Sequence, residues 1–415
     1  MIRRIRTQLR FGWEHFPRQF WLLFFGMLIS TTGASMVWPF LMIYVSEKLQ
    51  LPLTSVTTLL TLNAAMGLLS TFLAGPVIDR AGRKKVMVAS LALDGLAMAF
   101  LSQASTLPAF AILMGLRGAI NPLYRVGADA MMADLIPKDL RPDAYSLLRM
   151  SNNIGIAIGP AVGGFLVIHS YGITFMIAAV GLVTYSLMLA FLARETLPAE
   201  AQAAREPESF GGYGRVFSDR KFIAFVSIFT ANQVCAALIW VLLGVYAKHN
   251  FGVPENQYGW LATTNAVMVV FLQITVTQQT KRFPPLNVLA LGAFLYASAV
   301  GSIALGQSFW AFWASMVAMT FGELMLVPTS NTYAANLAPI DMRGRYMSLY
   351  GITWGIASGV GPLFGGILSD HFGPRSTWVG GFLVGMLGVA GFLLLARRAR
   401  RAEALPAPTL AAGPD

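Results

Sequence analysis

Cysteine and histidine are scarce in this chain, which limits the chemistry that it can perform. The 415 residues include a single cysteine, Cys235. One cysteine cannot form an intramolecular disulfide or a thiolate metal cluster. The four histidines are His15, His169, His249 and His371. They are dispersed at or beyond the ends of apolar segments, whereas the ligands of a catalytic metal are grouped. We therefore expect no metal site, no cofactor and no enzymatic activity.

Charged residues are also few, which indicates a membrane environment. Only 12% of the residues are charged, against about 25% in ordinary soluble proteins, and 56% are hydrophobic, with a mean hydropathy of +0.61. Apolar runs of about 20 residues, enough to cross a bilayer, recur without the alternation of barrel strands. This predicts an all-α integral membrane protein with twelve transmembrane helices. The expected spans are residues 19–45, 55–78, 84–103, 108–130, 143–168, 173–193, 221–246, 257–279, 287–306, 309–335, 345–368 and 377–396.

The chain repeats itself at one fixed offset. The segment that starts at Ala133, ADLIPKDLRPDAYSLLRMSNNIGIAIGPAVGGFL, matches the segment that starts at Ala335, ANLAPIDMRGRYMSLYGITWGIASGVGPLFGGIL, at a shift of 202 residues. The same shift pairs Trp38 with Trp240. A repeat this long in an apolar chain is typical of transporters built from two equivalent halves. We expect two six-helix bundles that are related by a 202-residue internal repeat.

Lysine and arginine gather on alternate connecting segments, which indicates the orientation in the membrane. Basic residues lie in segments 1–18, 80–85 and 138–141, and the positive-inside rule predicts these segments in the cytoplasm. The net charge of +11 then reflects topology, and we expect the anionic inner leaflet, not a nucleic acid, to be the partner of the first segment. The protein is expected in the plasma (inner) membrane, multi-pass and monomeric, with both termini cytoplasmic.

These features predict five regions in the chain. The two bundles are connected by a polar segment rich in proline and glycine, and the C-terminal tail contains little that could be buried. The expected regions are a cytoplasmic amphipathic N-terminus 1–18, an N-terminal bundle 19–193, a cytoplasmic linker 194–220, a C-terminal bundle 221–396 and a disordered cytoplasmic tail 397–415.

The loop after the second span carries the sharpest motif, GPVIDRAGRKK, over residues 75–85. Taken alone, a basic loop of this kind also fits a purely topogenic role. Its order of residue types resembles a loop signature of the major facilitator superfamily. The resemblance implies a gating motif formed by Gly75, Asp79, Arg80, Gly82 and Arg83. We expect acidic and basic residues at the end of the fourth span to pair with this loop as a gate latch, namely Arg125, Asp129 and Asp134.

A second motif lies on the fifth span. Its small residues allow close helix packing, and its proline interrupts the helical hydrogen bonds. The motif consists of Gly155, Gly159, Pro160, Gly163 and Gly164 and resembles the antiporter motif of the drug:proton antiporters within that superfamily. The resemblance covers the layout of the whole chain and implies a central cavity that opens alternately to each side. Ordinary helix packing is the alternative explanation of the glycines.

Three charged residues in the middle of spans are candidates for proton coupling, because a charge at that depth costs about 2.5 to 3.5 kcal/mol on insertion scales. Glu323 lies near the centre of the tenth span and corresponds by the repeat to Asn121. Asp94 lies in the third span and Arg117 in the fourth. In the family motif a glycine follows the arginine of the fourth span by four residues, whereas Arg117 is followed by Asn121. A buried carboxyl that never titrates is the alternative for Glu323, and packing or gating is the alternative for Asp94.

Aromatic and amide side chains inside the spans are candidates for lining a substrate cavity, although most aromatic residues in spans are simply packed. The candidates are Trp38, Tyr44, Asn63, Asn121, Asn232, Gln233, Trp240, Asn265, Tyr333 and Trp354. The sequence contains no GxxxxGK[ST] phosphate-binding loop. We expect an antiporter that uses the proton gradient to export lipophilic, cationic drugs, with a small molecule as its substrate. A carrier for a specific polar metabolite such as a sugar, and a non-transporting membrane sensor, remain the alternatives.

Overall fold

The computed structural model describes residues 12–137, 140–197, 213–339 and 342–403. These residues form helices and short connections, with no strand among them. The long helices fall into two groups of six. The first group is α2 (Arg18–Leu49), α3 (Leu53–Ala81), α4 (Arg83–Leu101), α5 (Leu107–Leu135), α6 (Arg141–His169) and α7 (Tyr171–Leu192). After the short α9 (Tyr213–Ser218), the second group is α10 (Arg220–Phe251), α11 (Glu255–Thr280), α12 (Pro285–Ile303), α13 (Phe309–Leu337), α14 (Arg343–Phe372) and α15 (Ser376–Glu403).

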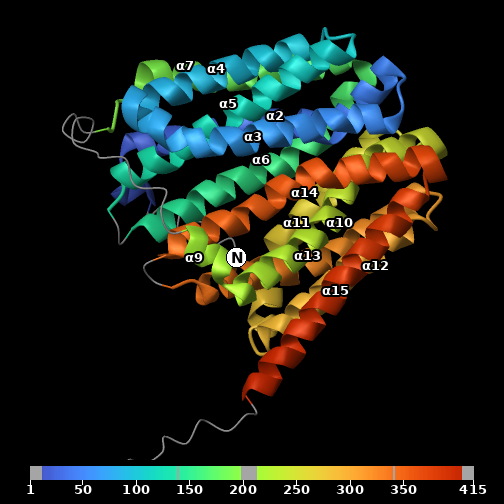
Figure 1. Cartoon of the computed structure of the whole chain (residues 1–415). Coiled ribbons are helices and arrows are strands. Elements are labelled where there is room, and N and C mark those ends of the chain that lie inside the picture. Colours follow the sequence, from blue (N-terminus) through green and yellow to red (C-terminus); the bar gives the residue numbers. More distant parts are fainter. Residues whose placement is uncertain (1–11, 138–139, 198–212, 340–341, 404–415) are drawn as a thin grey trace, which may run out of the picture.

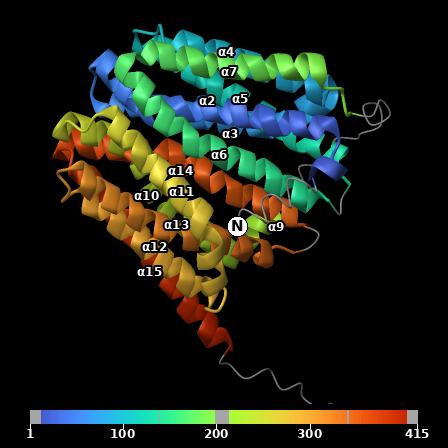
Figure 2. The same ribbon diagram turned by 180° about the vertical axis from the view of Figure 1, so that it is seen from behind.

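The two groups form two bundles that lie side by side (Figures 1 and 2). Helices α3 and α6 of the first bundle face α14 and α11 of the second, and α4, α7, α12 and α15 lie on the outer sides. The predicted fold class, an all-α protein of two six-helix bundles, is confirmed. The first five helices of the second bundle begin 202 residues after their counterparts, and α15 begins 205 residues after α7. The number 202 is therefore the offset between equivalent helices, and each bundle is itself shorter than that.

Most of the long helices coincide with apolar stretches of the sequence that are long enough to cross a bilayer. Ten of the described helices are long and apolar enough to cross a membrane. Helices α4 and α5 are outside that group because each carries several charged residues, including Asp94 on α4 and Arg117 and Arg125 on α5. The helices also extend past the expected spans at several ends, as α10 does to Phe251.

Capping side chains fix several helix starts, and one pair of caps follows the repeat. The hydroxyl of Thr106 accepts a hydrogen bond from the Ala109 amide at the start of α5, and the hydroxyl of Ser308 accepts one from the Ala311 amide at the start of α13. Such caps satisfy amides that have no partner inside the helix. Equivalent helices in the two halves therefore begin with the same kind of hydroxyl N-cap.

Glycines on α6 bring helix backbones together both within and between the bundles. A Cβ on Gly163 would lie 2.3 Å from the carbonyl oxygen of Met36 on α2. A Cβ on Gly164 would lie 2.8 Å from the carbonyl oxygen of Glu255 on α11 of the other bundle. Side chains larger than hydrogen do not fit at either position. The antiporter-like motif thus packs α6 on α2 and on α11.

The bundles meet tightly at one end of the molecule. We call the end that carries the linker between α7 and α10 the linker end, and the other end the closed end. At the closed end, Lys248 forms ion pairs with Glu47 of the first bundle and with Glu255 of its own bundle. Tyr171 donates a hydrogen bond to Glu255 at 2.7 Å, and Asp370 accepts from the first amides of α3. These polar contacts join the two bundles.

Some sequence expectations fall on residues outside those that the structure describes. Residues 1–11 of the expected amphipathic N-terminus, 198–212 of the linker and 404–415 of the tail are among them. Within the expected linker, the structure contains α9. The expected tail from residue 397 begins inside α15, which continues to Glu403.

Candidate functional site

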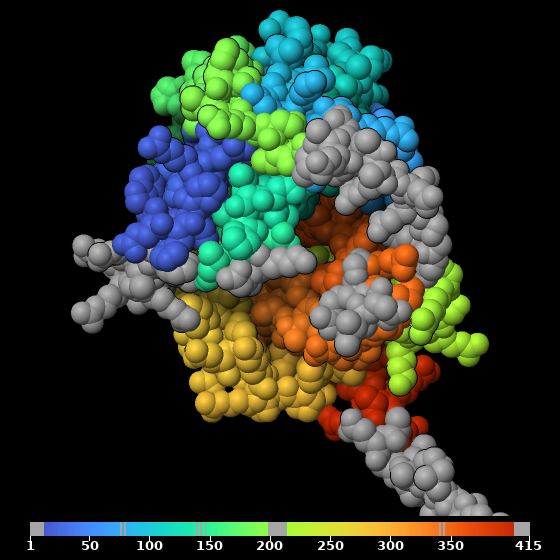
Figure 3. All heavy atoms as spheres, turned by 90° about the vertical axis from the view of Figure 1, so that its left-hand side faces the viewer, coloured from blue at the N-terminus to red at the C-terminus, as the bar shows by residue number. Residues whose placement is uncertain are grey.

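A cavity of about 1690 Å³ lies between the two bundles. Figure 3 shows a hollow between the bundles at the linker end, whereas the closed end is bridged by the Lys248 contacts. Residues of α2, α3, α5 and α6 line the cavity on one side, and residues of α10, α11, α13 and α14 line it on the other. The space is therefore a shared site that exists only because the two bundles face each other.

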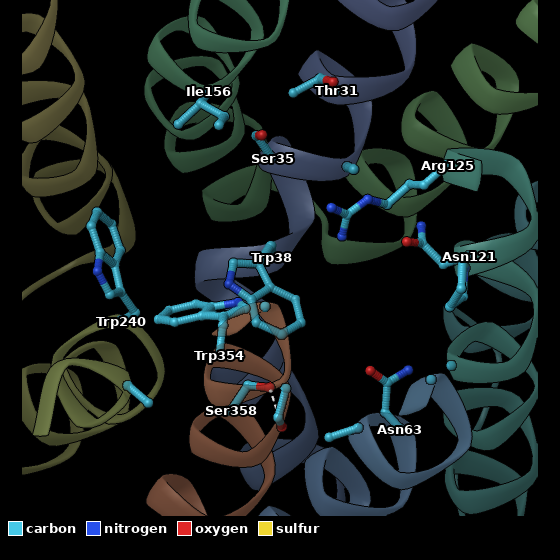
Figure 4. Close-up of a pocket in the computed structure, with 18 of the residues that line it drawn as sticks. Thr31, Ser35, Trp38, Asn63, Asn121, Arg125, Ile156, Trp240, Trp354 and Ser358 are labelled. Carbon is cyan, nitrogen blue, oxygen red and sulfur yellow. Dashed lines mark hydrogen bonds between the residues drawn. The ribbon is translucent and has the colours of Figure 1, made fainter. Parts of the chain in front are cut away.

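Tryptophans supply the apolar part of the lining. Trp38 lies on α2, Trp240 on α10 and Trp354 on α14, and all three line the cavity (Figure 4). Trp38 is 42% exposed and Trp354 is 45% exposed, so large ring surfaces are free to contact a ligand. In the view of Figure 4 the three indoles lie on one side, and Asn63, Asn121 and Arg125 lie on the other. Such a pocket suits flat, lipophilic molecules with a polar end.

Glu323 lies at the middle of α13 and lines the cavity from the second bundle. The side-chain amide of Asn265 on α11 donates hydrogen bonds to its carboxylate at 2.7 Å and to the Thr320 hydroxyl at 3.0 Å. Asn265 also lines the cavity. The arrangement gives one carboxyl that is held by a neutral partner and reached from the cavity, so its charge can change without breaking an ion pair.

Asp94 and Arg117 form an ion pair inside the first bundle. The Arg117 Nε donates to the Asp94 Oδ1 at 2.6 Å, and the two side chains are 14% and 6% exposed, respectively. Arg117 lines the cavity, whereas Asp94 lies behind it on the outer helix α4 and is not among the lining residues. Each charge thus has its counter-ion, which offsets the cost of burial.

The other charged lining residues lie nearer the linker end. Arg125 and Asp129 on α5 line the cavity, as do Arg80 and Arg345. Figure 4 shows the Arg125 side chain pointing into the space between the helices. The three residues expected to form the gate latch therefore lie in two places. Arg125 and Asp129 line the cavity, and Asp134 forms an ion pair with Arg83 of the loop motif at 2.9 Å.

The loop after α3 is held by a residue that the sequence analysis did not single out. The carboxylate of Glu195, just after α7, accepts hydrogen bonds at 3.1 Å from the amides of Arg83 and Lys84 at the start of α4. Gly82 has a φ of 92°, and a Cβ there would lie 2.6 Å from the Glu195 carboxylate. An acidic residue at a helix N-terminus is favourable. Gly75 and Asp79 lie on α3, but their surroundings are outside what the structure describes.

Three expected cavity residues are packed elsewhere, which corrects the sequence-based expectation. The Tyr44 hydroxyl donates to the Ser102 carbonyl at 2.9 Å, and its ring packs beside Phe175. Asn232 is fully buried on α10, and Tyr333 packs its ring beside Phe225. Their side chains face the interior of their own bundles instead of the space between bundles. The residues that do line the cavity are Trp38, Asn63, Asn121, Gln233, Trp240, Asn265 and Trp354.

The contact between Lys248, Glu47 and Glu255 was also missed from sequence. From sequence, Lys248 is an isolated cation beyond a span. Its two partners lie at the ends of two different helices, Glu47 near the end of α2 and Glu255 at the start of α11. Neither Glu47 nor Glu255 corresponds to an acid in the other half. A concentration of acids near the closed end, which also includes Asp370, was the available signal.

Comparison with known proteins gives relatives along most of the chain. An antiporter of Planococcus maritimus for Na⁺, Li⁺ and K⁺ against H⁺ is 27% identical and covers 81% of this chain and 86% of its own length. Multidrug resistance protein 1 of Bacillus subtilis is 25% identical over 84% of this chain and 89% of its own. The uncharacterized MFS-type transporter YttB of the same organism is 27% identical over 93% of this chain and 97% of its own.

Solved structures share the fold at low sequence identity. The nucleoside transporter NupG matches with a TM-score of 0.78 at 12% identity, over 91% of this chain and 99% of its own. A POT family transporter in complex with a thioalcohol-conjugated peptide matches with a TM-score of 0.77 at 16% identity, over 94% of this chain and 98% of its own. The family model of the Major Facilitator Superfamily matches residues 23–237 and 229–412. With its two facing bundles and shared cavity, this chain belongs to the major facilitator superfamily.

Proposed function

We propose that this protein is a proton-coupled antiporter that exports lipophilic, cationic compounds across the inner membrane by alternating access. The observation that carries the proposal is Glu323, a carboxyl in the middle of α13 that lines the cavity and whose hydrogen-bond partner, Asn265, is neutral. Its charge attracts a cation, and a proton that takes the same carboxyl releases that cation. The tryptophan-lined side of the cavity supports lipophilic ligands. The name of the multidrug resistance relative supports the same substrate class.

In the proposed cycle the linker end faces the cytoplasm. The cavity then opens inward, where a cationic compound pairs with the ionised Glu323 carboxylate. The bundles rock, the Lys248–Glu47 contact opens, and the cavity faces the outside. A proton from the outside neutralises Glu323 and displaces the compound, and the protonated carrier returns. Binding of cation and proton is exclusive because one carboxylate serves both, and this exclusion couples the two flows.

The test is export of two dyes by the Glu323→Gln protein in liposomes. Glutamine mimics the protonated carboxyl, so we expect export of the cationic ethyl ester of rhodamine B under a pH gradient to fall at least tenfold. Export of the neutral dye Nile red should fall less, and the melting temperature should stay close to that of the unchanged protein. Normal export of the cationic ester by Glu323→Gln would refute the proposal and make Asp94 the next candidate for coupling.

Exchange of an alkali-metal cation for protons is a second candidate function. The hydroxyl of Thr320 and the side chain of Asn265 lie at Glu323, and such oxygen-bearing groups are the ligands that hard cations prefer. The name of the Planococcus maritimus relative favours this candidate. Proton release on addition of NaCl or KCl to the reconstituted protein, with no response to either dye, would favour it over drug export. Export of a sugar in place of the dyes would favour the polar-metabolite alternative.

A further inference from the structure

Arg125 is a charged side chain that lines the cavity and forms no ion pair within the described residues. The structure records no hydrogen bond and no ion pair to its guanidinium within the described residues, although the guanidinium is directed into the cavity. Asp129, one turn further along α5, interacts with it electrostatically but forms no ion pair with it. Arg117 on the same helix, in contrast, is neutralised by Asp94. Arg125 is thus a cation of the first bundle that lines the cavity and forms no ion pair or hydrogen bond with the described residues.

The depth of Arg125 sets it apart from the basic residues at the mouth. It lies ten residues before the end of α5 at Leu135, which is about 15 Å along a helix axis. Arg345, which also lines the cavity, lies two residues after the start of α14, at the linker end. Water reaches both while the cavity is open. From these depths we expect that closure of the linker end around a ligand encloses Arg125 and leaves Arg345 near the surface.

An enclosed guanidinium needs a counter-charge. Taking an unpaired charge out of water costs several kcal/mol, and a pairing anion offsets that cost. Guanidinium matches a carboxylate in geometry through two parallel hydrogen bonds. A ligand that carries an anionic group therefore eases closure of the cavity, whereas a ligand with only a cationic group leaves Arg125 unpaired.

The neighbours of Arg125 fit the polar end of such a ligand. Asn121 lies one turn away on the same face of α5, and Thr31 and Ser35 of α2 also line the cavity (Figure 4). The carboxyl of Glu323 is on the opposite bundle, and the three tryptophans also line the space. Arg125 and Glu323 thus present charges of opposite sign to one ligand from opposite bundles.

We propose that Arg125 forms an anion subsite in the cavity and that the preferred substrates are zwitterionic amphiphiles, with a carboxylate at Arg125 and a cationic group on the side of Glu323. This inference rests on the proposed export function and specifies its substrate class. Arg125 is then a specificity-determining residue, because it separates substrates that share the same lipophilic cation. Arg125 of the first bundle binds the anionic group of the substrate, and Glu323 of the second bundle binds its cationic group.

The experiment uses two dyes that differ in one charge. Rhodamine B carries a delocalised cation and a carboxylate, and its ethyl ester keeps the cation and lacks the anion. Fluorescence anisotropy measures binding of each dye to the purified full-length protein in detergent. We expect Arg125→Gln to weaken rhodamine B binding at least tenfold, the lower end of what a hydrogen bond to a charged group contributes. Binding of the ester should weaken less than threefold or become tighter.

Two further variants keep the experiment interpretable. Arg345→Gln removes the same charge at the mouth of the cavity, and it should change the affinity for the two dyes by a similar factor of less than three. Arg125→Lys keeps the charge without the two-pronged geometry, so its rhodamine B affinity should lie between those of the unchanged protein and Arg125→Gln. Melting temperatures establish that each variant is folded.

The inference is overturned if Arg125→Gln changes binding of both dyes equally or of neither, or if Arg345→Gln discriminates between the dyes as strongly. It is also overturned if Asp129→Asn makes rhodamine B bind at least tenfold more tightly, because Asp129 would then be the counter-ion of Arg125. These binding results are independent of the coupling test. Discrimination at Arg125 together with normal dye export by Glu323→Gln would remove the coupling role of Glu323 and leave the subsite in place.

Discussion

The ion pair of Asp94 with Arg117 shows how two residues set the charge at the edge of the cavity. The two side chains bridge α4 and α5, and both are largely buried. Removing one partner of a buried pair is more harmful than removing both, because it leaves an uncompensated charge. The pair therefore fixes α4 against α5 and presents no net charge to the cavity.

Replacement of Asp94 should reveal this role through stability. Asp94→Asn leaves Arg117 without a counter-ion, which costs about 3 to 5 kcal/mol for fully buried pairs and less here because Arg117 borders the cavity. We expect the melting temperature in detergent to fall, and the double variant Asp94→Asn with Arg117→Met to recover part of the loss. A double variant less stable than Asp94→Asn would mean that the pair contributes more than mutual neutralisation.

Sequence identified the charged residues of the cavity better than their partners. Glu323 and Asp94 could be found because an acid in the middle of an apolar run is rare and costly. That Asn265 holds Glu323, or that Arg117 reaches Asp94, depends on how each helix is rotated toward its neighbour. The same dependence on rotation explains why Tyr44, Asn232 and Tyr333 face the interior of their bundles. Helix rotation is weakly encoded in spans that are apolar all round.

Among the helices, α6 shows how small residues set the spacing of a bundle. Gly155, Gly159 and Gly163 lie on the face that contacts α2, where a Cβ would meet atoms at 2.9, 2.5 and 2.3 Å, respectively. The atom closest to Gly163 belongs to the backbone of α2, which cannot rotate away as a side chain can. The separation of α2 and α6 is therefore set by the absence of side chains.

A methyl group at Gly163 should separate these helices. Gly163→Ala gains helix propensity of about 1 kcal/mol, but overpacking of this kind costs about 1 to 3 kcal/mol, and the nearest backbone atom leaves no room to relax. We expect a lower melting temperature and slower export. Gly172→Ala is the matched control, because the nearest atom to its Cβ is the Ser170 hydroxyl at 3.5 Å. Equal behaviour of the two variants would contradict the packing role of the motif.

Helix positions were more predictable than helix ends. The expected spans follow the apolar runs, and each contains the core of one observed helix. The ends differ because polar residues beyond an apolar run still continue the helix until a cap or turn stops it, as at Gly252, which follows α10 with a φ of 66°. Bilayer length sets the apolar run, and local chemistry at the connections sets the end.

For the whole molecule, the direction of transport depends on which end faces the cytoplasm. The cavity opens at the linker end and is bridged at the closed end. The distribution of lysine and arginine predicts a cytoplasmic linker end. The proposed cycle requires that orientation, because drug must enter the open cavity from inside the cell.

Cysteine labelling in intact cells measures the orientation directly. The native Cys235 is buried, so an introduced cysteine would be the reactive one. Gly214 on α9 has no atom within 4 Å of an added Cβ, and Gln307 lies exposed in the connection between α12 and α13 at the closed end. A membrane-impermeant maleimide should label Gln307→Cys and spare Gly214→Cys until the cells are opened. Labelling of Gly214→Cys in intact cells would reverse the orientation and the direction of export.

Neutralisation of Arg117 by Asp94 also has an electrical consequence. Because Asp94 and Arg117 neutralise each other, Glu323 is the group that takes up a proton in the proposed cycle. One proton then enters for each substrate that leaves. Exchange of one inward proton for one outward cation moves no net charge across the membrane. Exchange of one inward proton for one outward zwitterion, which has no net charge, moves one positive charge inward. A membrane potential of about 100 mV contributes about 2.3 kcal/mol to that second exchange alone. A potassium diffusion potential, applied with valinomycin at equal pH on both sides, should therefore drive transport of rhodamine B beyond that in protein-free liposomes. For the ethyl ester, the protein should add no transport to the passive movement that protein-free liposomes show, and an equal protein-dependent response of both dyes would refute a one-proton exchange.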